Sequence, residues 1–160
     1  MGESLLVVRD GRTERGWTDK VLEAFKDITV SNIDEAERRG MNEYLVLALP
    51  NYAVGVVSWE RFKEVLKYVP AANYEERMNE SPKFADFVEA ASMAPGSYLH
   101  IVVIGKGRED EGVIIDGILL PIQEGADDAL WILLHSELAA PDEVQFVEVN
   151  GRQYIWLWWD

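Results

Sequence analysis

The dipeptide Asn150-Gly151 lies between two runs rich in β-branched and aromatic residues, and it constrains the fold more than any other feature. Asn-Gly favours the two-residue turn that joins adjacent antiparallel strands, because both positions tolerate positive φ. We therefore predict that residues 143–149 and 152–158 form an antiparallel hairpin. The register that follows pairs Val149 with Arg152, Val147 with Tyr154, Phe146 with Ile155, Gln145 with Trp156 and Val144 with Leu157.

This register assigns the hairpin side chains to two faces, because successive side chains alternate across a sheet. The expected core face carries Val144, Phe146, Ile155 and Leu157. The other face carries Val147, Val149, Tyr154, Trp156 and Trp158, among Glu143, Gln145 and Arg152. An aromatic surface with polar neighbours is not an ordinary solvent face. The chain's own helices, a second subunit or a stacked ligand could cover it, and the pattern leaves these alternatives open.

The order of strand-like and helix-like segments predicts an α+β fold. Apolar, β-branched runs predict strands at 5–8, 44–49, 52–57, 98–104, 113–115 and 118–120. Apolar residues at helical spacing predict helices that begin near Thr18, Ser31, Ser58, Ser81 and Asp127. The polar stretch 73–83 predicts a long surface loop. Because the strands concentrate after residue 97, we expect a mostly antiparallel sheet with several amphipathic helices packed on it.

Length and composition indicate one folded domain over residues 1–160, since 48% of the residues are hydrophobic. The chain contains no cysteine, which excludes disulfides, thiolate metal sites and thiol nucleophiles. The first ten residues lack the basic start and apolar stretch of a signal peptide. No apolar run approaches the roughly 20 residues of a membrane helix. We therefore expect a cytoplasmic protein without a membrane partner.

The formal net charge of -14 argues against nucleic acid as a partner, because a phosphate backbone would be repelled. The basic residues are scattered, and Arg38-Arg39 is their only adjacent pair. The stretch Gly105-Lys106-Gly107-Arg108 has glycines and cations, but a phosphate-binding loop must lead into a helix. Here a strand is predicted to follow, after the acidic run 109–111. We expect a charged hairpin loop and no cofactor.

The chain has two histidines, His100 in a predicted strand and His135 in a predicted helix. Their separation excludes the His-x-x-x-His and His-x-His spacings of local metal sites, so we expect no metal. No serine lies in a Gly-x-Ser-x-Gly turn. A Ser–His–Asp triad assembled from distant segments stays open, and ordinary packing is the alternative for each histidine.

Asp116 lies inside an apolar run, where a buried and unpaired carboxylate would be costly. Asp116 is either a functional acid or a solvated residue in a turn with Gly117. The segment itself could be a tight hairpin with this turn or one continuous strand with a bulge. We favour the turn. Asp127-Asp128 is explained by the dipole at the start of a helix, without metal chemistry.

The segment 130–134 reads Leu-Trp-Ile-Leu-Leu, which extends the apolar surface around the predicted helix. Such a helix is buried on more than one side, by its own domain or by a partner. We therefore expect a non-catalytic interaction or regulatory module that self-associates as a homodimer, with Trp131, Tyr154, Trp156 and Trp158 in the interface. The alternative is a small-molecule-binding protein or enzyme that uses these rings with Asp116, His100 or His135.

Overall fold

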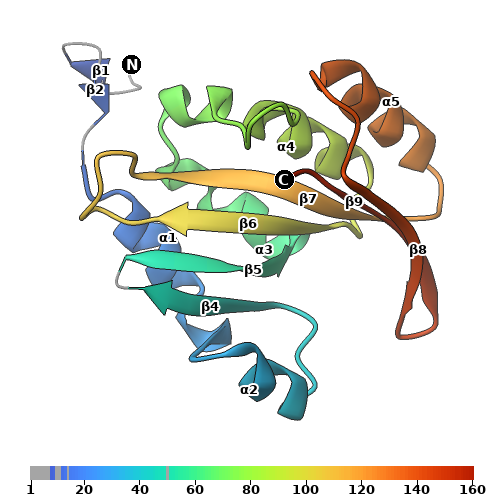
Figure 1. The fold of residues 1–160 in the computed structure, drawn as a ribbon, viewed down its shortest axis with the longest axis horizontal. Helices are drawn as coiled ribbons and strands as arrows, with labels where there is room; N and C mark the ends of the chain where they lie inside the picture. Colours follow the sequence, from blue (N-terminus) through green and yellow to red (C-terminus); the bar gives the residue numbers. More distant parts are fainter. Residues whose placement is uncertain (1–7, 10–11, 14, 50) are drawn as a thin grey trace.

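A sheet of seven strands forms the centre of the molecule, in the order β3-β4-β5-β6-β7-β9-β8. The computed structural model describes residues 8–9, 12–13, 15–49 and 51–160. β3 lies parallel to β4, and every other neighbouring pair in this sheet is antiparallel (Figure 1). This confirms the predicted α+β class and the mostly antiparallel sheet.

Short strands and helices are mixed in the first part of the chain, and the part after α4 consists of four strands and one helix. The strands are β1 (Val8–Arg9), β2 (Arg12–Thr13), β3 (Thr29–Val30), β4 (Tyr44–Leu49), β5 (Tyr52–Ser58), β6 (Tyr98–Ile104), β7 (Gly112–Pro121), β8 (Glu143–Val149) and β9 (Arg152–Trp158). The α-helices are α1 (Thr18–Ala24), α2 (Ile33–Arg38), α3 (Trp59–Val65), α4 (Phe84–Met93) and α5 (Ala126–Ser136). Short 3₁₀ helices are η1 (Lys26–Ile28), η2 (Leu66–Tyr68) and η3 (Ala71–Glu75).

The C-terminal hairpin has the predicted register at every pair, from Val149 opposite Arg152 to Val144 opposite Leu157. Asn150 and Gly151 both have positive φ, of 52° and 79°, as this turn requires. The predicted strands at 44–49, 52–57 and 98–104 are also present. The predicted strand at 5–8 lies outside the described residues except for Val8. β3 was not predicted, since two residues show no periodicity.

The hydrophobic core lies between one face of the sheet and the helices α1, α3, α4 and α5. The sheet contributes residues that alternate along each strand, such as Leu99, Ile101 and Val103 of β6. The helices contribute Val21, Phe62, Phe84, Phe87, Ala90, Ala129 and Leu133, among others. In Figure 1, α1 and α3 lie behind β4–β6. The opposite face of the sheet therefore faces away from the helices that form the core.

The turn predicted at Asp116-Gly117 is wrong. Residues 112–121 form the single strand β7, which pairs with β6 on one side and with β9 on the other. The register shifts at His100/Ile101, so the strand contains a bulge, the other topology that the sequence allowed. Asp116 is 4% exposed rather than solvated.

The predicted core face of the hairpin is confirmed for β9 and wrong for β8. Leu157 is buried in the core, and Ile155 packs against it. Val144 and Phe146 are 55% and 73% exposed. β8 is the outermost strand of the sheet, and no described helix makes a substantial contact with it. Val144 and Phe146 therefore lie on the same face of the sheet as the core helices but are not covered by them.

The helices begin within three residues of the predicted positions, but several caps differ. Ser58 caps α3 as expected, accepting a hydrogen bond from Arg61 N. α2 is capped by Asn32 rather than by Ser31, and α5 follows Gly125 rather than Asp127. The predicted surface loop at 73–83 contains part of η3, and its Asn73 is buried. The Asn73 side-chain amide donates to Val113 O and accepts from Val113 N, so its polar atoms are satisfied despite the burial.

Candidate functional site

The bulge in β7 brings Asp116 to the same face of the sheet as His100. Ile101 lies opposite Ile115, whereas His100 lies opposite Gly117, so Asp116 is the additional residue. Bulges re-aim side chains in this way. The carboxylate contacts His100 of β6 on one side and Trp158 of β9 on the other. The extra residue thus links the strands on both sides of β7 through one side chain.

Both oxygens of the buried Asp116 carboxylate are hydrogen-bonded. Oδ1 lies 2.6 Å from His100 Nδ1, and Oδ2 accepts from Trp158 Nε1 at 3.3 Å. These bonds offset the cost of burying the carboxylate. Because an ionised carboxylate only accepts, Nδ1 of His100 donates, and in a neutral ring Nε2 is left as an acceptor. No described residue bonds to Nε2, and the side chain is 23% exposed.

Further aromatic side chains surround this pair. The rings of His100 and Trp156 meet edge to face at 6.1 Å, and those of Tyr98 and Tyr154 do the same at 6.1 Å. Such tilted contacts match the ring quadrupoles. Each pair joins β6 to β9 across the intervening β7. We call the sheet face that carries Tyr98, His100, Tyr154, Trp156 and Trp158 the aromatic face; Tyr154 is buried in it, and the other four side chains are half-buried.

Both partly exposed indoles of the aromatic face are fixed by carboxylates. Trp156 Nε1 donates to Glu143 Oε1 of β8 at 2.8 Å, and Trp158 Nε1 donates to Asp116. Gly117 provides the space between the rings. A Cβ atom at Gly117 would lie 2.8 Å from Trp156 Cη2 and 3.1 Å from Trp158 Cδ1. A side chain at this position would therefore displace the rings.

The Tyr98 phenol stays protonated at neutral pH. Burial raises its pKa above the ordinary value, and the neighbouring Tyr154 and Glu43 add to this effect more strongly than Arg152 opposes it. Tyr98 therefore offers a neutral hydroxyl rather than a phenolate.

The structure brings Asp116 and His100, which the sequence singled out separately, together with Tyr154, Trp156 and Trp158, which were predicted to share one face of the hairpin. It does not place Trp131 and His135 with them. These two lie on α5, where their rings stack at 4.2 Å and Trp131 is 63% exposed. In the same helix Leu133 belongs to the core and Leu130 packs against it, while Leu134 is exposed. The helix is thus buried along one stripe only.

Within the part of the chain that the structure describes, the helices that build the core do not cover the aromatic face, as one of the three expected alternatives had it. The helices α1, α3, α4 and α5 contribute to the core on the opposite face. No pattern in the sequence marks Tyr98, Glu143 or Gly117 as site residues. Their roles depend on the register between β6, β7, β9 and β8, which only the assembled sheet defines.

The loop between β6 and β7 is the expected charged hairpin loop, and its cations are paired with acids. Lys106 Nζ lies 3.0 Å from Asp19, and Arg108 Nε lies 3.1 Å from Asp110. Glu111 accepts hydrogen bonds from the backbone of Gly16 and Thr18, and from the Thr18 hydroxyl. The loop therefore closes over the start of α1.

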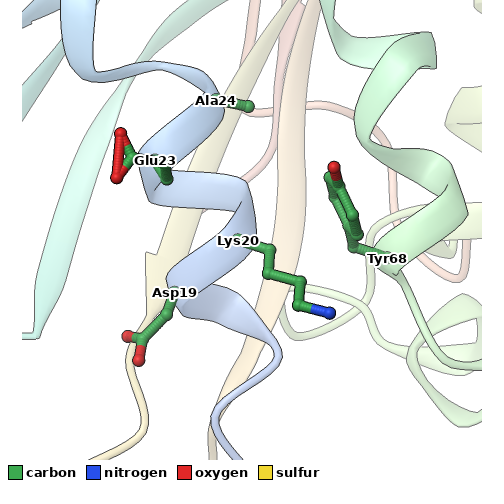
Figure 2. Close-up of a pocket in the computed structure, with 5 residues that line it drawn as sticks. All are labelled: Asp19, Lys20, Glu23, Ala24 and Tyr68. Atoms are coloured by element: carbon green, nitrogen blue, oxygen red, sulfur yellow. The ribbon is translucent and has the colours of Figure 1, made fainter.

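A concavity lies on the helix side of the molecule, between α1 and the end of η2 (Figure 2). Its volume is about 400 Å³, and Asp19, Lys20, Glu23, Ala24 and Tyr68 line it. Figure 2 shows Lys20 extending toward Tyr68 while Asp19 and Glu23 project from the other side of α1. The ammonium groups of Lys20 and Lys67 lie 5.6 and 5.4 Å from the Tyr68 ring centre. This groove has no group of converging polar side chains like that of the aromatic face.

Among the described residues, no group of three or more histidine, aspartate or glutamate side chains is placed to hold a metal ion. In the same part of the chain, no helix is both long and apolar enough to cross a membrane. No family model, curated protein or solved structure matches this chain.

Proposed function

We propose that the protein binds a small organic molecule on the aromatic face. The observation that carries this proposal is the His100–Asp116 pair held between indole rings on a sheet face that the core helices do not cover. Binding sites combine apolar and aromatic walls with a few oriented polar groups. A ligand would stack on Trp156 and Trp158 and exchange a hydrogen bond with Nε2 of His100.

The polar groups of this face are oriented before any ligand arrives. Asp116 fixes the ring of His100, while Glu143 and Asp116 fix the indoles through their N–H groups. Fixed side chains lose little conformational entropy on binding, which favours affinity. A face that served only to contact solvent would not need this arrangement.

The six tryptophans allow a direct test, because each indole N–H gives its own resonance in a nitrogen–proton NMR spectrum. Titration with a library of small metabolites is expected to move the resonances of Trp156 and Trp158. The Trp131 resonance, on α5, serves as the internal control. Hits that move only Trp131, or a library without hits, would contradict the proposal. The variants Trp156→Phe and Trp158→Phe assign the resonances.

Self-association as an interaction module is the second candidate function. Val144 and Phe146, exposed on the outermost strand β8, favour it, because an uncovered edge strand can pair with another copy. Phe146→Glu is expected to give a folded monomer if dimers form through β8. Trp156→Glu is expected to do so if they form through the aromatic face. A wild-type protein that light scattering shows to be monomeric at high micromolar concentration rules out both arrangements.

We also propose a cytoplasmic location, which the cysteine-free composition supports, since such a chain has no need of an oxidising compartment. Fractionation of cells that express the tagged chain tests this location.

A further inference from the structure

The indoles of Trp156 and Trp158 both direct their N–H groups at carboxylates. Trp156 Nε1 lies 2.8 Å from Glu143 Oε1, and Trp158 Nε1 lies 3.3 Å from Asp116 Oδ2. An aromatic ring has a positive edge and a negative face. Here the positive edges are paired with negative groups, so the ring faces and the nearby carboxylates present the same sign of potential. Such a surface attracts cations and repels anions.

Several aromatic rings of the protein make cation–π contacts with its own lysine and arginine side chains. Arg152 lies over the ring of Tyr154 at 5.8 Å, on this same face. Arg108 lies over Tyr52, Arg61 over Phe25, and both Lys20 and Lys67 over Tyr68. Among the described residues, no lysine or arginine lies over Trp156 or Trp158. Indole is the ring that binds cations most strongly, so the rings of this face that bind cations best have no cationic partner among the described residues.

The charges around these indoles have the same sign. The formal net charge of the chain is -14, which enriches cations near its surface. Arg152 is held at the other end of the face, where it contacts Tyr154 and hydrogen-bonds to Gln123. A negative neighbourhood also fits the raised pKa of Tyr98, to which Glu43 contributes after burial and Tyr154.

The size of this region suits a small molecule. The side chains belong to the neighbouring strands β6, β7, β9 and β8. Strands lie about 4.8 Å apart, so the region from His100 to Glu143 spans roughly 14 Å. A surface of this width accommodates one small ligand, with its cationic group over the indoles and the rest toward His100.

We infer that the ligand is a small organic cation, such as a quaternary ammonium or alkylammonium compound, bound against the indoles of Trp156 and Trp158 near the carboxylate of Glu143. This inference rests on the proposed function, because it names the class of ligand for the same site. Aromatic side chains with nearby carboxylates recognise ammonium groups through cation–π contacts and charge.

Choline and its neutral isostere 3,3-dimethylbutan-1-ol form the matched pair of probes. Titration is followed by the indole N–H resonances of the full chain, with choline chloride balanced against potassium chloride to hold the ionic strength constant. Choline is expected to move Trp156 and Trp158 and to bind about two- to fivefold more tightly than the isostere, which is the effect of one exposed cation–π contact.

The variant Glu143→Gln removes the negative charge while its amide oxygen can still accept from the Trp156 indole. Choline binding is expected to weaken severalfold in this variant, and the affinity for the isostere is expected to stay unchanged. Glu148→Gln on the same strand is the control. Glu148 bonds to Gln153 and to neither indole, so this change is expected to leave choline binding intact.

The outcomes separate this inference from the proposed function. Equal binding of choline and the isostere, or library hits that are only neutral or anionic, overturns the inference and leaves the small-molecule site standing. Binding of oligolysine without binding of choline also overturns it, because the occupant is then a basic polypeptide. If no compound moves Trp156 or Trp158, both proposals fail.

Discussion

His100 and Asp116 are 16 residues apart in the chain, and their side chains meet at 2.6 Å across neighbouring strands. Direct pairing of β6 and β7 would set His100 opposite a single residue. The bulge adds Asp116 beside Gly117, so that the carboxylate reaches both His100 and Trp158. A local irregularity of the backbone thus produces the polar centre of the aromatic face.

Replacement of Asp116 by alanine leaves the ring N–H groups of His100 and Trp158 without their acceptor. The free energy of unfolding is expected to fall by about 1–3 kcal/mol, the usual cost of orphaning partly buried polar groups. Urea denaturation followed by circular dichroism measures this loss. Asp128→Ala is the control, since Asp128 is exposed at the start of α5 and is expected to change stability by less than about 1 kcal/mol.

Substitution of Gly117 by alanine tests the packing of the indoles. The added Cβ would lie 2.8 Å from Trp156 Cη2 and 3.1 Å from the Leu157 carbonyl oxygen, and the backbone atom cannot move aside easily. We expect a loss of about 1–3 kcal/mol, typical of overpacking, together with shifted indole resonances of Trp156 and Trp158. Gly96→Ala is the matched comparison. The three atoms nearest to its Cβ all belong to the guanidinium at the end of the flexible Arg152 side chain, so a loss as large as that of Gly117→Ala would contradict this explanation.

The C-terminal hairpin could be predicted residue by residue because its information is local. Asn150-Gly151 fixes the turn, and the turn fixes the register, as the structure confirms. Asp116-Gly117 shows where such reasoning fails. Asp-Gly between apolar runs is also typical of a tight turn, and only the pairing of β7 with β6 and β9 decides in favour of a continuous strand.

Alternation along a strand identifies its faces but does not tell what covers them. Val144 and Leu157 belong to the same face of the hairpin, yet Val144 is 55% exposed and Leu157 is 2% exposed. The difference arises because β8 is the edge strand, beyond the helices. In the same way, the sequence identified Asp116, His100 and Trp156 separately. Their convergence follows from the strand order β6-β7-β9, which no local pattern contains.

Glu111 is expected to stabilise the start of α1 from a distant part of the chain. Its carboxylate accepts from Gly16 N at 2.9 Å, from Thr18 N at 3.2 Å and from Thr18 Oγ1 at 2.7 Å. It thereby replaces the N-cap side chain, which makes no such bond in this helix. Glu111→Ala is expected to cost about 1–2 kcal/mol, as for loss of a helix cap. Glu109→Ala, in the same exposed loop, should have little effect, and equal losses would refute the capping role.

Duplex DNA is expected to bind too weakly to measure at physiological salt. The net charge of -14 repels phosphate, and Lys106 and Arg108 of the charged loop are already paired with acids. A fluorescence-anisotropy titration with a random duplex in about 150 mM salt tests this expectation. A dissociation constant below about 1 µM would show that a local basic surface overrides the net charge.

Glu137 is expected to make the stability of the protein depend on pH in the direction opposite to that of a carboxylate held in an ion pair. Its Oε2 atom is buried without a hydrogen-bond partner among the described residues, and burial raises its pKa, against a smaller opposing contribution from Trp159. Between the unfolded pKa, about 4.3, and the raised folded pKa, the folded state binds more protons than the unfolded state. The free energy of unfolding contributed by this group therefore falls as pH rises through that interval. Glu137→Gln removes the titration, so we expect a variant more stable than the wild type at neutral pH and a flatter stability curve as the pH rises above about 4. Urea denaturation across this range measures both, with the exposed Glu124→Gln as the control; a Glu137→Gln curve parallel to that of the wild type would show that the carboxylate is solvated in the folded protein.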